Sequence, residues 1–200
     1  MKKLPFLLCF VLLLCSCSES DEVNEYNDWP DRNAHYLDSI ATLARNGVDG
    51  WTMYKAYTLG DEYDDLSGPR KYYVYAKSLE QGEGTYSPLY KDSVRVHYTG
   101  HLIPTATYPQ GYNFDRSFNG TTLNEDIDVP TLMTPSALVT GFSTALMHMV
   151  QGDRWQVVIP PYLGYGTGGS GSIPANSVLI FDIKLARVYR YGIDTDTSWH

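Results

Sequence analysis

Cysteine is scarce in this 200-residue chain, and its three cysteines all lie within the first 17 residues. The part of the chain beyond Cys17 therefore contains no pair of cysteines that could form a disulfide. Its stability must come from the packing of apolar side chains.

Basic residues are also few. Fifteen Lys and Arg face 23 Asp and Glu, which gives a formal net charge of −8. Binding to a nucleic-acid backbone depends on cations that neutralise phosphates, so this acidic balance argues against nucleic acid as a partner. The length suits one domain with an appendage.

Signatures of several enzyme classes are missing. No HExxH motif occurs, and among the five histidines only His97 and His101 have a spacing that would place them on one strand face, so we expect no metal site. The glycine-rich run around Ser170 has neither the Lys-Ser/Thr of a phosphate-binding loop nor the strand-to-helix context of a hydrolase nucleophile. We expect no cofactor.

No apolar run is long enough to span a bilayer, since the run from Leu4 to Leu14 is well short of the usual requirement of about 20 residues. With Lys2 and Lys3 before it, this run is typical of a secretory signal. It ends in Leu14-Cys15-Ser16-Cys17, which resembles the lipobox of bacterial lipoproteins. The resemblance implies removal of residues 1–16 and acylation of Cys17, with a lipid anchor in the outer membrane; a non-lipidated export signal is the alternative.

Residues 17–30 form a polar, acidic stretch with little to bury, and we interpret them as a solvated tether. Removal of residues 1–16 deletes two lysines and takes the formal charge from −8 to −10. Acidic residues beside a lipidated cysteine also resemble the tags that direct some lipoproteins to the cell surface. Periplasmic and surface-exposed locations therefore both remain open.

Apolar residues recur at i, i+3, i+4 and i+7 from Leu37 to Ala44 and predict a helix from Asp31 to Asn46 that stops at Gly47. This helix could pack on the rest of the chain or on a second copy of itself, which would make a homodimer. The following residues mix aromatic and acidic side chains without a period. We interpret residues 31–68 as a helical and irregular appendage.

Beyond residue 68, apolar and polar residues alternate in several segments. In residues 91–102, Val94, Val96 and Tyr98 alternate with polar side chains, as expected for a half-buried antiparallel strand. Similar strands are predicted over residues 72–79, 155–159 and 179–185.

One amphipathic helix is expected between these strands. Phe142, Leu146 and Met149 share one face of it, and Gly152 marks its exit. Because the apolar faces of the helix and the strands must cover one another, the pattern predicts an α+β domain.

Six stretches of this region carry a family resemblance. They read VRVHYTGHL, FDRS, LVTGF, MVQGD, IPPYLGYG and SIPANSVLIFDIKL, in that order along the chain. In order and spacing they are similar to the FKBP-type peptidyl-prolyl cis-trans isomerase family. We expect the family domain over residues 69–191, followed by a tail of residues 192–200.

The resemblance implies a strongly twisted, half-open antiparallel sheet wrapped around one short helix, with an aromatic pocket between them. It implies catalytic roles for Tyr98, Asp115, Phe142 and Tyr165. It implies a substrate-binding wall made by Phe114, Val129, Leu138, Val139, Ile173 and Phe181. In this scheme Phe142 replaces the tryptophan that floors the family pocket, the Tyr165 hydroxyl is a donor, and the main-chain N–H of Val139 holds a substrate carbonyl.

The loop from Ile159 to Phe181 would carry Tyr165 to the pocket. Its glycines permit conformations closed to other residues and its prolines stiffen both shoulders, although composition alone fits a mobile hairpin tip equally well. Besides Phe142, other features depart from the family pattern: Val129 stands where an aromatic residue is usual, and Arg116 is the nearest match to the arginine that often follows the FDSS stretch.

Two functional hypotheses follow from the resemblance. The first is isomerisation of Xaa-Pro bonds in exported proteins, by binding of the twisted amide in an apolar aromatic pocket. The second is a catalytically weak or inactive binding module for a Pro-containing segment or a surface partner.

Overall fold

A computed structural model describes residues 24–194 and 196–199. The predicted signal segment, Cys17 and the first part of the acidic tether lie outside these residues.

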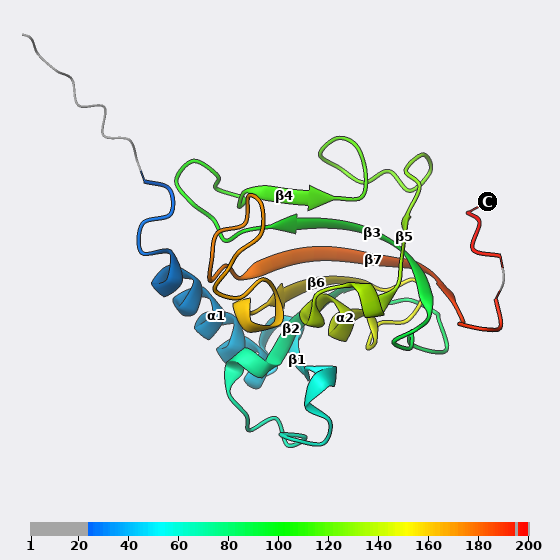
Figure 1. Cartoon of the computed structure of the whole chain (residues 1–200), viewed down its shortest axis with the longest axis horizontal. Helices are drawn as coiled ribbons and strands as arrows, with labels where there is room; N and C mark the ends of the chain where they lie inside the picture. Colours follow the sequence, from blue (N-terminus) through cyan, green and yellow to red (C-terminus); the bar gives the residue numbers. More distant parts are fainter. Residues whose placement is uncertain (1–23, 195, 200) are drawn as a thin grey trace, which may run out of the picture.

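A seven-stranded sheet with antiparallel pairings forms the body of the molecule (Figure 1). Its order is β1-β2-β6-β7-β3-β4, and β5 pairs with β3 beside β4. The strands are β1 (Trp51–Lys55), β2 (Tyr73–Glu80), β3 (Ser93–His101), β4 (Asn113–Arg116), β5 (Thr131–Met133), β6 (Arg154–Ile159) and β7 (Leu179–Tyr189). The strands expected from alternation are therefore present.

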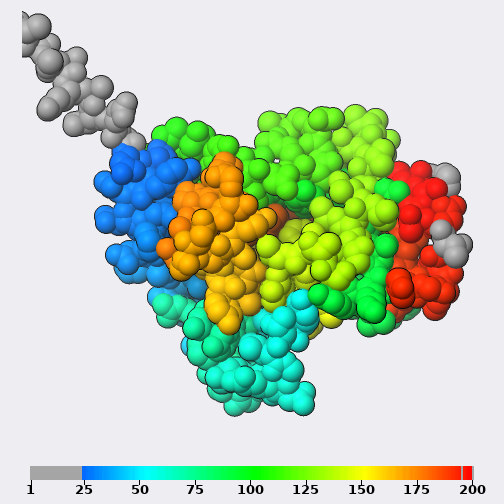
Figure 2. Space-filling view, in the orientation of Figure 1, coloured from blue at the N-terminus to red at the C-terminus, as the bar shows by residue number. Residues whose placement is uncertain are grey.

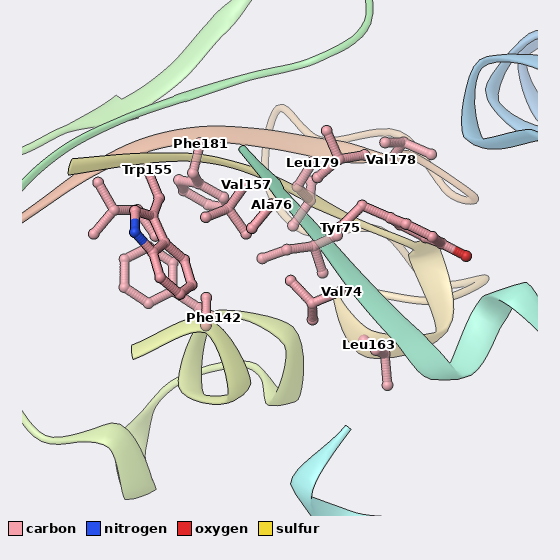
Figure 3. Packing of buried hydrophobic residues seen from close by; sticks show 14 of the residues in the cluster. Val74, Tyr75, Ala76, Phe142, Trp155, Val157, Leu163, Val178, Leu179 and Phe181 are labelled. Atoms are coloured by element: carbon pink, nitrogen blue, oxygen red, sulfur yellow. The ribbon is translucent and has the colours of Figure 1, made fainter. Parts of the chain in front are cut away.

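The helix α2 (Thr140–Leu146) packs on the inner face of the sheet (Figure 1). The alternating residues of β6 and β7 point toward it, so Trp155, Val157 and Phe181 are buried between helix and strands (Figure 3). The helix can approach β6 closely because of Gly141, where an added Cβ would lie only 2.2 Å from Cγ2 of Ile159. The predicted arrangement of an antiparallel sheet around one short helix is confirmed.

The helix α1 (Trp29–Arg45) matches the predicted N-terminal helix and packs against β1 and β2 of its own chain. Its Tyr36 lines a groove together with Gln156 and Ile180, which alternate with the inward-facing residues of β6 and β7. Hence α1 covers the outer face of the sheet, opposite α2. The apolar stripe of α1 is buried by this packing, so a homodimer built on that stripe would have to displace it.

Two buried polar contacts fix α1 to the segment just before β7. The indole Nε1 of Trp29 donates to Oγ of Ser177 at 2.8 Å. Asn33, which is 1% exposed, donates from Nδ2 to the carbonyl of Trp29 (2.7 Å) and accepts at Oδ1 from the N–H of Val178 (2.8 Å). These bonds connect the N-terminal part to the end of the long loop between β6 and β7.

The strand β1 was not expected from the sequence. Trp51 and Met53 are buried on one of its sides, while Tyr54 on the other stacks on Trp155, with ring centroids 5.3 Å apart. On the face of Tyr54, Thr52 is exposed, so the strand begins with an alternation of buried and exposed residues. The alternation is short, and the aromatic Tyr54 interrupts it where a polar residue would continue it, so the sequence pattern did not reveal this strand.

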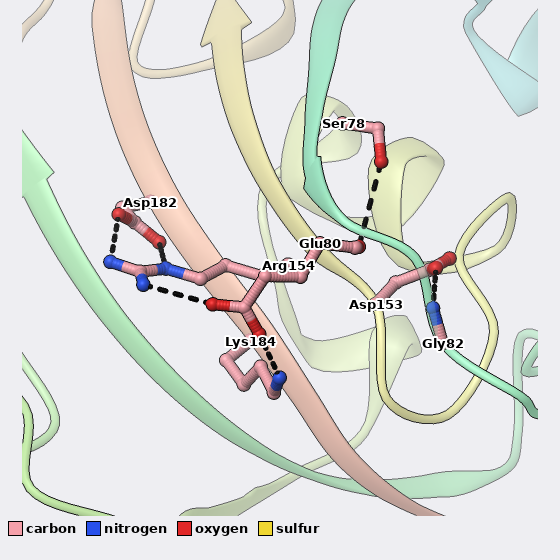
Figure 4. A network of polar contacts seen from close by, with 7 residues as sticks. All are labelled: Ser78, Glu80, Gly82, Asp153, Arg154, Asp182 and Lys184. Carbon is pink, nitrogen blue, oxygen red and sulfur yellow. Dashed lines mark hydrogen bonds and ion pairs between the residues drawn. The ribbon is translucent and has the colours of Figure 1, made fainter.

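Part of the outer face carries a network of charges across β2, β6 and β7 (Figure 4). The guanidinium of Arg154 binds both carboxylate oxygens of Asp182, at 2.9 and 2.8 Å, and reaches Glu80 at 3.1 Å. Glu80 also accepts from Lys184. Hydrogen bonds from Lys184 and Arg154 hold the pKa of Glu80 below its usual value. These side chains keep this surface polar.

The C-terminal tail folds back onto β3. Arg95 donates from Nε and Nη2 to the carbonyl oxygen of Thr197, at 2.9 and 2.6 Å.

Among the described residues, no helix has the length and apolar character needed to cross a membrane.

Candidate active site

An aromatic cluster forms where α2 faces the inner side of the sheet. Phe142 rises from α2 toward Phe181 on β7, with ring centroids 5.0 Å apart and planes at 87° (Figure 3). Tyr98 on β3 meets Phe142 edge-on at 5.9 Å, and Phe114 on β4 meets Phe181 edge-on at 5.5 Å. Edge-to-face pairing is a favourable arrangement for such rings, so the four side chains form one aromatic unit.

Sheet register brings these rings together. Gly100 of β3 pairs with Phe181 of β7 on one side and with Asp115 of β4 on the other. A Cβ at Gly100 would lie 2.5 Å from Cε2 of Phe114 and 2.7 Å from Cε1 of Phe181. Both rings therefore close over a residue without a side chain. The family resemblance gave no role to Gly100, although this residue lies within its first stretch, VRVHYTGHL.

The surface above the cluster is hollowed. Figure 2 shows a depression between the loop of residues 160–175, in orange, and the yellow-green segment that contains α2, with the colour of β7 visible at its floor. Phe142 and Phe181 are only 4% and 6% exposed. The depression thus lies between the loop and the elements α2 and β7, which carry these two buried rings.

Tyr98 and Asp115 form the polar part of the cluster. The Tyr98 hydroxyl donates to Oδ2 of Asp115 at 2.9 Å, and Oδ1 of Asp115 accepts from the N–H of Arg116 at 2.8 Å. Burial of the phenol, together with this hydrogen bond to Asp115, raises the pKa of Tyr98 well above its ordinary value. Tyr98 is therefore a neutral hydrogen-bond donor across the physiological pH range.

Arg116 directs its side chain away from Asp115. Its Nε donates to Oδ1 of Asn113 at 2.7 Å, and its Nη1 donates to the carbonyl of Gly120. The guanidinium thus supports the turn after β4, and its backbone N–H is what binds the carboxylate of Asp115.

The loop between β6 and β7 is held by its own backbone hydrogen bonds. The N–H of Gly166 donates to the carbonyl of Pro161, and that of Asn176 donates to the carbonyl of Gly166, both at 2.8 Å. Ser170 and Ile173 pair at the tip, where Ile173 is buried. This loop presents Tyr165 with 40% of its surface exposed. Interaction with Tyr165 is among the causes that raise the pKa of Tyr98, after burial and Asp115.

The start of α2 supplies a free backbone donor. Val139 precedes the first helical residue, and its carbonyl accepts from the N–H of Ser143 at 3.1 Å. Its own N–H donates no hydrogen bond to any group in the described part of the chain. Leu138 and Val139 are half-buried and pack against the core. Among the described residues, the N–H of Val139 is therefore a backbone donor without an internal partner.

Val129 is a predicted wall residue that packs little against the rest of the molecule. It is 60% exposed, in the loop before β5. The cluster therefore brings together Tyr98, Phe114, Asp115, Phe142 and Phe181 by direct contact, whereas Val129 contributes little packing.

The two histidines of β3 show no metal-site geometry. His97 is buried beneath the loop that follows β4, and Nε2 of His101 lies 3.3 Å from Nδ2 of Asn113. Burial lowers the pKa of both side chains. Within residues 24–194 and 196–199, no group of three His, Cys, Asp or Glu side chains is placed to hold a metal ion.

Together, the half-open sheet, the short helix inside it and the aromatic floor define an α+β ligand-binding domain of the half-barrel class. The family model described as FKBP-type peptidyl-prolyl cis-trans isomerase matches residues 84–186. The chain belongs to this family.

Relatives with known names agree with this assignment. The chain is 37% identical over 111 residues to a macrophage infectivity potentiator of Trypanosoma cruzi, a match that covers 55% of this chain and 50% of that protein. It is 32% identical over 111 residues to the FKBP-type isomerase FkpA of Aeromonas hydrophila, covering 56% of this chain and 37% of the relative. The chain thus spans half or less of the length of these relatives.

Solved structures also match. The structure of FkpA from Escherichia coli superimposes with a TM-score of 0.56 at 25% identity, covering 82% of this chain and 62% of that one. A peptidyl-prolyl isomerase from Pseudomonas syringae pv. tomato matches in fold, with a TM-score of 0.52 at 24% identity, over 79% of this chain and 96% of that chain.

Proposed function

We propose that this protein catalyses cis-trans isomerisation of Xaa-Pro bonds in polypeptides. The observation that carries the proposal is the aromatic cluster of Phe142 and Phe181 with its Tyr98–Asp115 hydrogen bond, beside the depression between the 160–175 loop and the segment of α2 (Figure 2). Family membership supports the same reaction.

The reaction needs no nucleophile. Rotation about the peptide bond faces a barrier of about 18–20 kcal/mol because resonance gives the C–N bond partial double-bond character. The twisted amide has lost this resonance and is less dipolar than the planar form. A cleft that excludes water therefore favours the twisted amide over the planar one.

The residues of the cleft divide this work between them. The rings of Phe142 and Phe181 provide an apolar seat for the prolyl ring, and the N–H of Val139 holds the carbonyl of a neighbouring residue. Tyr98, kept neutral by burial and by Asp115, provides a fixed dipole at the edge. A millionfold acceleration requires about 8 kcal/mol of transition-state stabilisation, and desolvation with shape complementarity must supply most of it.

The test is a protease-free isomerisation assay on a Leu-Pro peptide, with the chain from Ser18 onward and its Phe142→Leu variant. We expect the variant to lose at least about tenfold in kcat/KM, or about 1.4 kcal/mol, because the aromatic floor is gone. Tyr191→Leu, which removes an exposed ring, is the matched control. An unchanged rate in Phe142→Leu would refute the site.

The second candidate function is that of a binding module. It is favoured by one observation: Val129, at the position where the family usually has an aromatic wall residue, is 60% exposed in the loop before β5. A folded protein that binds Leu-Pro peptides without accelerating their isomerisation would establish this alternative.

We also propose that the protein acts on exported polypeptides from a lipid anchor at Cys17, in the outer membrane and on its periplasmic or surface side. The support is the apolar run and lipobox-like end of the N-terminal segment. Metabolic labelling with palmitate should mark the wild-type protein and not a Cys17→Ala variant. Equal labelling of the two would refute the anchor.

A further inference from the structure

A second concave surface lies on the other side of the loop that carries Tyr165. It runs between α1, the short 3-10 helix η3 (Arg70–Tyr72) and the 3-10 helix η5 (Pro161–Leu163). Three hollows of about 700, 250 and 390 Å³ follow one another along it. Neighbouring hollows share lining residues, with Lys71 common to all three, so they form one continuous groove, here named the α1 groove.

The α1 groove is positively charged although the chain is acidic overall, with a net charge of −8. Arg45, Arg70 and Lys71 are exposed along it, and Asp38 is the one acidic residue among its lining side chains. Asp38 pairs with Arg70 at 2.6 Å. Arg45 and Lys71 make no ion pair within the described residues. Two cations are thus available to a carboxylate from outside.

Aromatic and apolar surface accompanies the charges. The ammonium of Lys71 lies 5.2 Å from the ring centroids of both Tyr72 and Tyr162, which fixes its position over the groove. Pro161 and Leu37 line the floor between Lys71 and the loop. A ligand that suits this surface is an extended chain that combines apolar side-chain surface with negative charge.

The α1 groove and the candidate active site lie on two sides of one loop. Pro160, Pro161 and Gly166 line it from the same loop that presents Tyr165 to the aromatic depression. In Figure 2 this loop, in orange, lies between the depression and α1, in blue. A chain that passes over the rim of the loop would therefore reach from one surface to the other.

The dimensions fit a peptide segment. Leu37 and Arg45 are eight residues apart on α1, which corresponds to about 12 Å along the helix axis. An extended peptide advances about 3.3 Å per residue and would cover this length in about four residues. Binding in such a channel orders several residues of a client at once.

We propose that the α1 groove binds an acidic, extended segment of the same polypeptide whose prolyl bond is isomerised, through Arg45, Arg70 and Lys71. This inference rests on the proposed isomerase function. It assigns substrate selection to the N-terminal part, because α1 and η3 lie outside the family-matched residues 84–186. Clients that carry Asp or Glu near the proline are selected over neutral ones.

The test compares three peptides with one Leu-Pro bond: a tetrapeptide, a peptide extended on both sides by six residues rich in Asp, and one extended equally by Ser. With the chain from Ser18 onward, we expect kcat/KM for the acidic peptide to exceed that for the Ser peptide about tenfold. The double variant Arg45→Glu/Lys71→Glu should lose this preference and retain wild-type turnover of the tetrapeptide. Lys77→Glu/Lys91→Glu makes the same change in net charge elsewhere and should keep the preference.

The outcomes separate the two proposals. Normal tetrapeptide turnover with no preference for the acidic peptide would overturn the groove and leave the isomerase standing. If no peptide is turned over, the isomerase fails, and fluorescence anisotropy of the labelled acidic peptide decides the groove: binding lost in Arg45→Glu/Lys71→Glu supports it, and unchanged binding overturns it. A third outcome would identify a membrane-binding patch instead. In that case the double variant loses binding to anionic phosphatidylglycerol vesicles, and its binding of the acidic peptide is unaffected.

Discussion

The N-terminal part, residues 24–83, and the family-matched part, residues 84–186, are built in different ways. The matched part contains most of the sheet, with α2 inside it, and the aromatic cluster comes from this part alone. The N-terminal part combines α1, three short 3-10 helices and the strands β1 and β2. The site therefore belongs to one part, whereas the sheet that supports it is completed by the other.

The two parts share one hydrophobic core. Tyr73 and Tyr75 of the N-terminal part and Val158 of the matched part are fully buried, and β2 pairs with β6 in the middle of the sheet. Each part leaves apolar surface that the other covers. The difference teaches that the limits of a sequence family need not coincide with the limits of a folding unit.

The largest effect is expected when α1 and β1 are removed by starting the chain at Pro69, which tests whether the matched part depends on them. This uncovers Tyr73, Tyr75 and Val158, and at about 1.5–3 kcal/mol for each fully buried side chain we expect a loss of more than about 4 kcal/mol of unfolding free energy. Thermal and urea unfolding followed by circular dichroism measures it. A chain that starts at Asn24 is the control, and equal stability of the two would mean that the matched part with β2 folds without α1 and β1.

The substitution Gly100→Ala acts only on the matched part, at the aromatic cluster. Its Cβ would displace the rings of Phe114 and Phe181, and we expect about 1–3 kcal/mol of destabilisation. Isomerisation of the tetrapeptide should fall at least about tenfold. Gly168→Ala is the control, since nothing lies within 4 Å of a Cβ there. Unchanged turnover in Gly100→Ala would separate the aromatic cluster from the reaction.

Asn33→Leu acts on the N-terminal part with a smaller expected effect. It leaves the buried N–H of Val178 without its acceptor, which should cost about 1–2 kcal/mol in chemical denaturation. Tetrapeptide turnover should change less than twofold, because the aromatic cluster is untouched. Asn119→Leu, at an exposed loop position, is the control. A large loss of turnover in Asn33→Leu would show that α1 positions the loop that carries Tyr165.

Much of the matched part could be predicted because its helix and strands are apolar on one face and polar on the other. Val94 and Val96 alternate with polar neighbours, and Phe142, Leu146 and Met149 share one helical face, so each element revealed its buried side. β1 could not be found in this way, because Trp51 and Met53 face α1 while Tyr54, on the side of the exposed Thr52, packs on Trp155. In a strand of five residues, this one aromatic side chain is enough to interrupt the polar alternation.

The same contrast holds within the candidate site. The rings of Phe114, Phe142 and Phe181 were selected by family resemblance, and the structure places them in contact. The importance of Gly100 depends on which residues face each other across β3, β4 and β7. The exposure of Val129 likewise depends on the tertiary structure. Neither can be predicted from a local sequence pattern.

The sequence by itself determined the periodic elements and the family, because periodicity and motif order are local properties of the chain. Only the tertiary structure decided where α1 packs, that Asn33 meets Val178, and that Arg45 and Lys71 line one groove beside the loop of Tyr165. These contacts join residues far apart in the chain. Their energies depend on burial and register, and both exist only once the sheet has formed.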